Sequence, residues 1–372
     1  MKNLTLLGSL IMMLSLHAQN VSTMTEGNFF DDIAIDFEGN VYGSDFYGDS
    51  IFKWDTQGNV SVFASGFLNP NGIGINPDGD LYICEHTASK IHKYSTDGTL
   101  LETYTGITNP SGVKNIPGTT DMVYVEWSTS TLGVLHDDGT KEVLAEGSPL
   151  FGPAGIAFID DVMYVSNYNN RKIMRYENGE MTTIAQLPSE SDSNAFLGFI
   201  DAKDGFIYAT SYGAHKIYQV NPTTGEYSTF AGSIQGNDDG PLQEATFNYP
   251  NGIYFDNDND RLLISDGGTK NLRIIDNISQ ALATDEYFID ASAIAVYPNP
   301  ANDAIQIKGS FDASKEYQIS VISADGGNVF NSKKVSGDEL SNISIVTSDW
   351  SKGIYFITIS VGNKSVTKKI IK

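Results

Sequence analysis

The stretch DLYICEHTASKIHKY, residues 80–94, decides the fold because its pattern returns along the whole first part of the chain. It contains an apolar strand around a tyrosine, a polar loop of a few residues, and a second strand with alternating apolar positions. The central tyrosine recurs at spacings of 40, 42, 40 and 44 residues, at Tyr42, Tyr82, Tyr124, Tyr164 and Tyr208, and Leu262-Leu263 occupies the sixth copy. A fixed period of this length indicates copies of one structural unit.

Two further strands complete each copy. A short apolar strand, rich in glycine, precedes the tyrosine strand, as in Gly72-Ile73-Gly74-Ile75, and a glycine-containing turn such as that at Gly58 or Gly98 leads to a fourth strand. Four strands in about 40 residues, repeated six times, are typical of a six-bladed β-propeller. We therefore predict an all-β fold with a six-bladed β-propeller over residues 20–280, followed by a small Ig-like β-sandwich.

A propeller needs its first and last blades joined, because an unpaired sheet edge would remain otherwise. The sixth copy lacks a fourth strand after Asp276. The missing pattern is found near the other end of the chain, where residues 20–27 (NVSTMTEG) match residues 59–66 (NVSVFASG). We expect residues 20–25 to supply this strand, with residues 282–290 as the competing candidate.

The repeat resembles the NHL family and, more loosely, the gluconolactonase-like propellers. The resemblance is clearest in residues 231–266, which contain a glycine-rich loop, Asp239-Gly240, Ala245-Thr246-Phe247-Asn248, Pro250-Asn251-Gly252-Ile253 and a strand that ends at Asp266. It implies the propeller fold. It does not choose between a binding protein and an enzyme, because propellers serve both.

The two ends of the chain indicate export. Residues 1–18 have one lysine, an apolar run and a small residue at Ala18, which predicts a secretory signal peptide. After a linker at residues 281–291, residues 292–372 contain several short alternating strands. Pro298-Asn299-Pro300, Gly353-Ile354-Tyr355-Phe356 and the lysine-rich end of the chain resemble the type IX secretion sorting domain of Bacteroidota. An ordinary Ig-like binding module is the alternative.

If the resemblance holds, it implies that the secretion machinery is a partner of this domain and that the protein is secreted or displayed at the outer surface. No segment beyond the leader is long and apolar enough to cross a membrane as a helix.

The charge of the chain restricts its partners. The formal net charge is −23, and residues 20–290 contain 39 acidic and 13 basic side chains. Such a surface repels phosphate backbones, which excludes nucleic acid as a partner. Cys84 is the only cysteine, so no internal disulfide and no cysteine metal cluster can form.

One ring of candidate site residues precedes the glycine of each inner strand. It contains Asp31 (or Asp32, if the register slips by one residue), Asn71, Ser111, Ala154, Leu197 and Asn251. The resemblance to gluconolactonase-like enzymes implies that Asp31, Asn71 and Asn251, on neighbouring blades, are ligands of Ca²⁺ or another divalent cation. Ala154 and Leu197 depart from that pattern. The alternative is that these side chains only bind backbone groups. Apart from this possible cation, nothing in the sequence requires a cofactor.

A second ring ends the tyrosine strands, at Asp45, Glu85, Glu126 (or Trp127), Asn167, Ser211 and Asp266. We expect it to be structural, with its oxygens accepting backbone N–H groups from the loop that follows. The loops beyond it hold the candidate ligand-binding residues Phe46, Tyr47, His86, Tyr168, Arg171, Tyr212 and His215. Aromatic and sparse polar groups around a channel mouth suit a peptide, protein or glycan, although packing against neighbouring blades would also explain them.

No catalytic residue can be named. The histidines of the repeats do not form an evident three-histidine zinc site, and no Gly-x-Ser-x-Gly elbow is present. The sequence therefore favours a secreted propeller that binds an extracellular ligand at its channel mouth. The alternative is a divalent-metal-dependent lactonase or hydrolase.

Overall fold

The structure is a computed structural model that describes residues 19–28, 31–189, 196–278, 294–309, 311, 315–324, 327–331, 334–361 and 364–372. The predicted signal peptide, the predicted linker and the competing strand at residues 282–290 lie outside the described residues. The chain divides into two compact units, residues 1–282 and 283–372.

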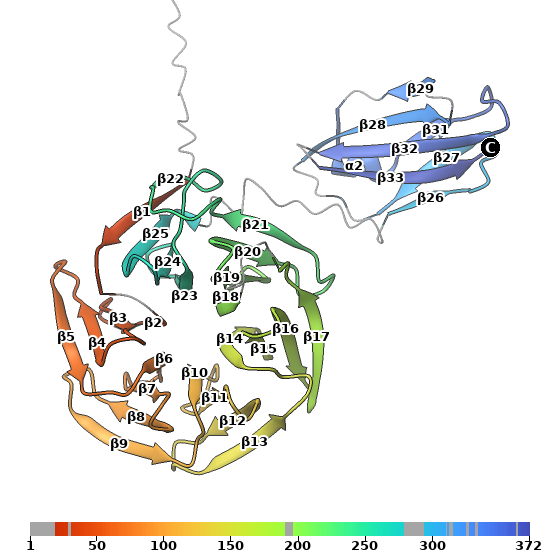
Figure 1. The fold of residues 1–372 in the computed structure, drawn as a ribbon. Helices are drawn as coiled ribbons and strands as arrows, with labels where there is room; N and C mark the ends of the chain where they lie inside the picture. The colour runs from red at the N-terminus through yellow and green to blue at the C-terminus, as the bar shows by residue number, and fades with distance from the viewer. Residues whose placement is uncertain are drawn as a thin grey trace, which may run out of the picture. The chain divides into compact units, whose positions relative to one another are not determined.

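The first unit is a six-bladed β-propeller, as predicted, with the blades arranged in chain order around a central axis (Figure 1). Blade 1 consists of β2 (Ile33–Ile35), β3 (Val41–Ser44), β4 (Ser50–Trp54) and β5 (Val60–Ser65). Blade 2 consists of β6 (Pro70–Ile75), β7 (Leu81–Glu85), β8 (Lys90–Tyr94) and β9 (Leu100–Thr105). Blade 3 consists of β10 (Pro110–Asn115), β11 (Met122–Glu126), β12 (Thr131–Leu135) and β13 (Lys141–Glu146). Blade 4 consists of β14 (Pro153–Ile159), β15 (Val162–Asn167), β16 (Lys172–Glu177) and β17 (Glu180–Gln186). Blade 5 consists of β18 (Leu197–Lys203), β19 (Phe206–Ser211), β20 (Lys216–Val220) and β21 (Tyr227–Ala231). Blade 6 consists of β23 (Pro250–Asp256), β24 (Arg261–Asp266), β25 (Asn271–Asp276) and β1 (Asn20–Thr25).

Blade 6 is completed by the other end of the propeller, which confirms the prediction for residues 20–25. Strand β1 runs antiparallel to β25, with Val21 opposite Ile275 and Thr23 opposite Arg273. The two-residue strand β22 (Gly240–Pro241) pairs with the outer side of β1. The ring is therefore closed by backbone hydrogen bonds between the first and last strands of the unit.

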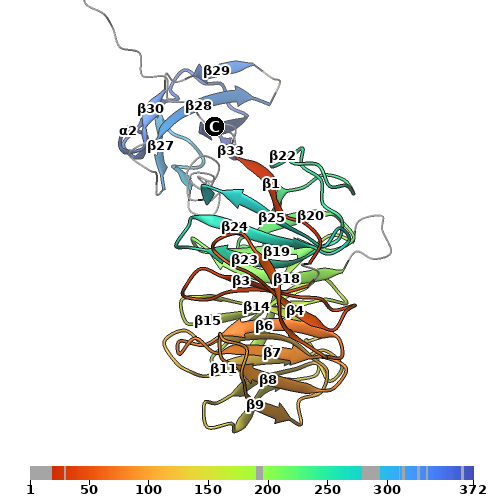
Figure 2. The same ribbon diagram turned by 90° about the vertical axis from the view of Figure 1, so that its left-hand side faces the viewer.

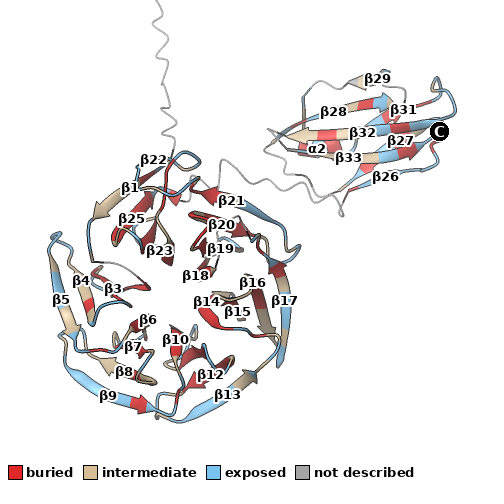
Figure 3. Ribbon diagram, viewed as in Figure 1, coloured by how far each residue is buried: buried red, intermediate tan, exposed pale blue. Residues whose placement is uncertain are grey.

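The packing follows from the position of each strand in its blade. Inner strands crowd around the axis, so that a Cβ atom at Gly112 would collide with the carbonyl oxygen of Ala154. Second strands are almost entirely buried, and β7 is buried throughout, whereas the outer strand β9 is mostly exposed (Figure 3). Figure 2 shows the propeller edge-on. The tyrosines of the repeat, such as Tyr82 and Tyr208, are buried between adjacent blades.

The second unit is a small β-sandwich, which confirms the predicted fold of the C-terminal region. One sheet consists of β26 (Ala295–Tyr297), β27 (Ala304–Lys308) and β31 (Ser344–Val346); the other consists of β28 (Glu316–Ser323), β29 (Asn328–Asn331), β32 (Ile354–Val361) and β33 (Lys364–Ile371), and β30 (Val335–Ser336) pairs with β28. Alternate residues face the core, including Tyr317, Ile319, Ile357 and Ile359. The short helix α2 (Gly337–Ser341) begins with a capping box between Ser336 and Glu339. None of the described helices has the length and apolarity of a membrane span.

Candidate functional site

A cavity of about 240 Å³ lies at one mouth of the central channel. Side chains from all six blades line it: Asp31, Phe46, Tyr47, Asn71, His86, Ser111, Trp127, Ala154, Tyr168, Phe199, Tyr212 and Asn251. This lining contains the three predicted metal ligands and five of the seven predicted ligand-binding residues. The structure therefore brings most of the candidate residues to one place, and their roles stay predictions.

An aromatic collar surrounds the mouth. It is formed by the residue one position beyond the ring that ends the tyrosine strands (Asp45 in blade 1, Glu85 in blade 2), and blades 1 to 5 contribute Phe46, His86, Trp127, Tyr168 and Tyr212. Blade 6 has Gly267 there, which leaves a gap in the collar. The rings of Phe46, His86 and Trp127 are in contact in sequence around the mouth, with centroids 5.6 and 6.2 Å apart.

A repeated backbone hydrogen bond fixes the collar. In blades 2 to 5 the amide of the collar residue donates to a carbonyl of the loop that enters its own blade, as His86 does to Asn69 at 3.1 Å and Trp127 to Asn109 at 3.1 Å. In blades 4 and 5 an aromatic ring adds support, because Tyr168 stacks on Phe196 at 4.5 Å between centroids. Tyr212 stacks on Tyr249 in the same manner, at 4.7 Å.

Trp127 is the collar residue that the sequence analysis did not select as a ligand-binding candidate. Blade 3 has one residue fewer than the others between the repeat tyrosine and the end of its second strand, since Glu126 follows Tyr124 by two residues whereas Glu85 follows Tyr82 by three. The amide of Thr108 donates to Glu126 at 2.9 Å, which identifies Glu126 as the strand-end residue. Aligning the blades on that residue would have identified Trp127.

Asp31 and Asn251 form a buried polar pair in the lining of the cavity. The side-chain amide of Asn251 donates to Oδ1 of Asp31, and both residues are almost completely buried. Burial, reinforced by the neighbouring Asp32 carboxyl group, raises the pKa of Asp31 well above the usual value, and the bond from Asn251 opposes this shift. The register is therefore that of Asp31; Asp32 lines the other end of the channel.

The donors at this mouth are few for a metal ion. Within the described part of the chain, no three His, Cys, Asp or Glu side chains converge as they would around a cation. The side-chain oxygens of Asp31, Asn71 and Asn251 share the cavity, with one carboxylate among them. Ca²⁺ takes about six to eight oxygen ligands, so this set supplies only part of a coordination shell.

The position predicted for blade 5 was wrong by one residue. Leu197 has the register in its blade that Pro250 has in blade 6, so Gly198 is the counterpart of Asn251. Leu197 is fully buried in an apolar cluster. The inner strands of blades 2, 3, 4 and 6 begin with a proline, which marks the register in the sequence. The inner strand of blade 5 has no such proline, so the sequence did not show the offset.

The same register gives the position of Phe199 in its blade. It occupies the position at which four other blades have a glycine, namely Gly72, Gly112, Gly155 and Gly252. Its side chain is 5% exposed and lines both the mouth cavity and a second cavity of about 240 Å³. Phe199 therefore lies where the two cavities adjoin.

The second cavity has a different character. Lys114 donates to Asp201 at 2.5 Å and lies over the ring of Tyr254, with the Nζ atom 5.9 Å from the centroid. Asp32 accepts the amides of Ile33 and Ile73 at 2.9 and 3.0 Å. Its pKa is raised to about 7, chiefly by burial. The charged groups at this end are therefore matched to partners within the chain.

The strand-end ring is structural, as expected, but the source of its hydrogen bonds differs from the prediction. Glu85 accepts the amide of Leu68 at 2.8 Å, and Asn167 accepts the amide of Phe151 at 3.1 Å. Both donors precede the blade, in the loop that arrives from the blade before. In blades 2, 3, 4 and 6 the ring residue therefore binds a backbone amide of the incoming connection. Glu126 and Asp266 also accept threonine hydroxyls from the loop that follows.

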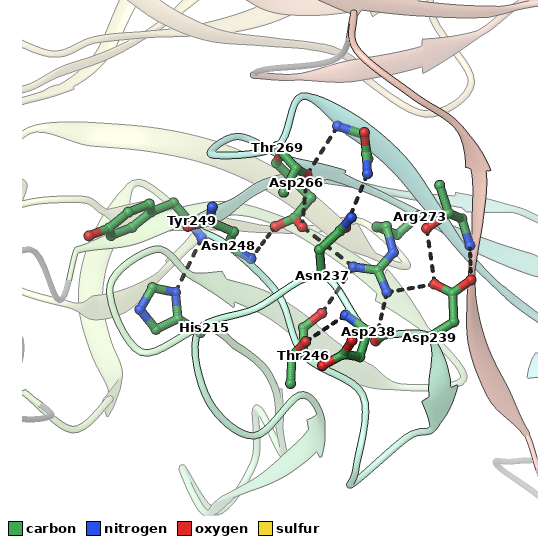
Figure 4. Close-up of polar contacts among 12 residues, drawn as sticks. His215, Asn237, Asp238, Asp239, Thr246, Asn248, Tyr249, Asp266, Thr269 and Arg273 are labelled. Atoms are coloured by element: carbon green, nitrogen blue, oxygen red, sulfur yellow. Dashed lines mark hydrogen bonds and ion pairs between the residues drawn. The ribbon is translucent and has the colours of Figure 1, made fainter.

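Arg171 and His215 lie outside the lining of the mouth cavity. Both occupy the last turn position before a third strand, with φ of 58° and 57°. Nδ1 of His215 accepts the amide of Tyr249 at 3.2 Å, and its ring contacts that of Tyr249 (Figure 4). His215 thus supports a residue that stacks on the collar. Nε of Arg171 is buried without a hydrogen-bond partner in the described structure.

Blade 6 contains a polar network that the sequence did not indicate. Arg273 is fully buried and lies between Asp266 and Asp239, at 3.4 and 2.9 Å from their carboxylate oxygens (Figure 4). It also donates to the carbonyls of Thr246 and Asp238, at 2.9 and 3.1 Å. Burial raises the pKa of Asp266 to about 6, and the Asn248 amide and Arg273 oppose the shift.

Comparison with known proteins gives one result for the C-terminal unit and another for the propeller. Residues 295–372 match the model of the secretion system C-terminal sorting domain. That domain indicates export by the type IX system to the cell surface or the extracellular space, which confirms the predicted localisation. The predicted partnership with the secretion machinery follows from the same match. No curated protein matches the chain in sequence.

Solved structures similar to this one are propellers, which confirms the resemblance at the level of the fold. An auxiliary nutrient binding protein from Bacteroides ovatus shares 15% identity over 69% of this chain and 76% of its own, with a TM-score of 0.58. A gluconolactonase from Xanthomonas campestris shares 17% over 69% and 89%, with a TM-score of 0.56. A catalytically inactive virginiamycin B lyase from Staphylococcus aureus, solved with quinupristin, shares 20% over 68% and 82%, with a TM-score of 0.51.

Proposed function

We propose that this protein is an exported propeller that binds an extracellular ligand at the mouth of its channel. The observation that carries the proposal is the aromatic collar over a buried polar floor: five blades place a ring at one structural position, and Asp31 and Asn251 lie below. Binding sites are commonly apolar cavities with a few convergent polar groups. The likeness in fold to auxiliary nutrient binding proteins of Bacteroides supports a role in capture.

The dimensions of the cavity restrict what enters it. Its volume of about 240 Å³ is below the ~300–1,000 Å³ typical of pockets for drug-sized ligands. A small molecule, or the terminal group of a peptide or glycan, would fit. Tyr47 is 71% exposed beside the collar, so the remainder of a longer ligand would contact this side chain.

The experiment is to screen the full chain for binding to arrays of peptides and glycans. We expect the bound members to be lost in Tyr212→Ala, which removes a collar ring, and kept in Tyr227→Ala, which removes a tyrosine from the outer strand β21. An empty screen, or binding that Tyr212→Ala does not reduce, would contradict the proposal.

A divalent-metal-dependent hydrolase is the second candidate, because Asp31, Asn71 and Asn251 do line one cavity. Against it, Ala154 and Gly198 supply no side-chain oxygen from blades 4 and 5, and the Asn251 amide nitrogen is directed at Asp31. The metal would polarise a lactone or ester carbonyl. The test is the melting temperature with EDTA and with millimolar Ca²⁺: a bound ion predicts a shift that Asn251→Ala abolishes.

A further inference from the structure

We propose that the group bound at the floor of the mouth cavity is a positively charged ammonium on a short apolar body, with the carboxylate of Asp31 as its counter-ion. This inference rests on the proposed ligand-binding function and names the chemical class of the ligand. Three features of the described residues support it: the environment of the Asp31 carboxyl group, the absence of a protein cation in the lining, and the aromatic collar above.

The carboxyl group of Asp31 is fixed in position and incompletely bonded. The backbone amide of Asp31 donates to the carbonyl of Ser44 at 3.0 Å, and the backbone carbonyl of Asp31 accepts the hydroxyl of Ser265. These two bonds hold the backbone on both sides of the side chain. Of the side-chain oxygens, Oδ1 accepts the Asn251 amide. No donor among the described residues bonds to Oδ2, and the residue lines the cavity. One carboxylate oxygen is therefore available to a ligand.

No cationic side chain of the described residues lines this cavity. The nearby Lys270 bonds to both oxygens of Asp45, at 2.9 and 3.0 Å, and is committed to that pair. His86 is the one basic group in the lining, and burial lowers its pKa, which favours the neutral ring. A buried carboxylate without a cation is unfavourable, and Asp31 is 3% exposed. A ligand that brings a positive charge would relieve this.

The aromatic collar suits the same group. Ammonium ions are attracted to the faces of Trp, Tyr and Phe rings. Trp127, Tyr168 and Tyr212 stand around the space above Asp31, and the tyrosine hydroxyls lie close enough to Asp31 to interact with its charge. The excess of 39 acidic over 13 basic side chains in residues 20–290 would attract cations to the propeller.

The test compares two probes that differ in one group. 2-Phenylethylamine carries an ammonium and 2-phenylethanol a hydroxyl on the same body. We expect calorimetric titration of the full chain to give about tenfold tighter binding of the amine. Asp31→Asn keeps the shape of the side chain and should remove this preference. Asp161→Asn makes the same change of charge at an exposed turn and should leave it unchanged.

The outcomes separate this inference from the proposed function. Equal affinities, tighter binding of the alcohol, or no binding of either probe would overturn the ammonium inference. Binding of neutral glycans on the array would then still support ligand capture. If Asp31→Asn does not fold, Tyr168→Leu provides the test, because it removes a ring face and keeps an apolar side chain. It should weaken the amine several-fold more than the alcohol, and an equal effect on both would contradict the inference.

Discussion

Both carboxylate oxygens of Asp239 accept hydrogen bonds from Thr23, one from its amide and one from its hydroxyl, each at 3.0 Å. These residues are 216 positions apart, and the contact joins the closing strand β1 to the loop that precedes blade 6. Asp239 is in turn bonded to the buried guanidinium of Arg273 at 2.9 Å. The closure of the ring therefore depends on an ionic network as well as on the pairing of β1 with β25.

Asp239→Ala should weaken this closure. The change removes both bonds to Thr23 and one partner of Arg273, and hydrogen bonds to charged groups contribute about 1.5–3 kcal/mol. Because Asp239 is half exposed, we expect a loss of about 1–2 kcal/mol in the free energy of unfolding, measured in urea.

Asp258→Ala is the matched control. It removes a carboxylate from an exposed turn of the same blade, where we expect a change within about 0.5 kcal/mol. Equal unfolding midpoints for the two variants would show that the contact between Thr23 and Asp239 does not stabilise the ring.

Arg273→Met should be more damaging. The guanidinium is fully buried and faces Asp266, which is also fully buried. Removing one partner of a buried ion pair costs about 3–5 kcal/mol because the other charge is left without compensation. Arg175→Met, at a half-exposed pair with Glu177, should cost less than about 1 kcal/mol.

A double variant tests the reason for the loss. Asp266→Asn in the Arg273→Met background removes the stranded charge, so the double variant should be more stable than Arg273→Met alone. Urea unfolding of the four proteins checks this, and a double variant less stable than the single one would contradict the account.

Much of the fold could be predicted because the propeller repeats itself. The 40-residue spacing of Tyr42, Tyr82 and their counterparts fixes the blades, and the likeness of residues 20–27 to 59–66 identified the closing strand. Both signals are local patterns of apolar, glycine and turn residues, which sequence shows directly. The candidate residues at the mouth were found for the same reason, since each lies at a position that the repeat defines, either before the glycine of an inner strand or after the end of a tyrosine strand.

The features that were missed depend on offsets or on contacts between distant segments. Trp127 was overlooked because blade 3 is one residue short, and Gly198 because the entry to blade 5 is irregular. Arg273 reads as an exposed strand residue; only the folded ring places Asp239 and Asp266 beside it. All three residues belong to one repeat, but the network depends on the pairing of β24 with β25 and on the fold of the loop that holds Asp239, which the pattern of apolar and glycine positions does not show.

The propeller should lose stability as the pH rises through the range in which Asp32 ionises. Burial raises the pKa of Asp32 in the folded state to about 7, whereas in the unfolded chain it lies near 3.8. Between these values the folded state binds more protons than the unfolded state, so the free energy of unfolding falls with rising pH. Asp266, with a pKa of about 6, contributes in the same direction.

Asp32→Asn should reduce the difference in unfolding free energy between about pH 5 and pH 8, since the variant cannot ionise at this position. Asp78→Asn, at an exposed hairpin turn, should leave the difference as it is in the unaltered protein. Urea unfolding at the two pH values measures it. A difference as large in Asp32→Asn as in the Asp78→Asn control would show that Asp32 does not carry this dependence.

Phe199→Ala should join the two channel cavities. Phe199 is buried and is the residue common to both linings, at a position where four other blades have glycine. Truncating a buried phenylalanine costs about 3–5 kcal/mol, and entry of water from the adjoining cavities places the expected loss at the lower end. Phe151→Ala, at a ring 54% exposed, should cost within about 0.5 kcal/mol.

A crystal structure of Phe199→Ala should show ordered water running from Asp31 to Asp32. A variant as stable as Phe151→Ala, with the two cavities still separate, would mean that neighbouring inner strands close the channel without this ring.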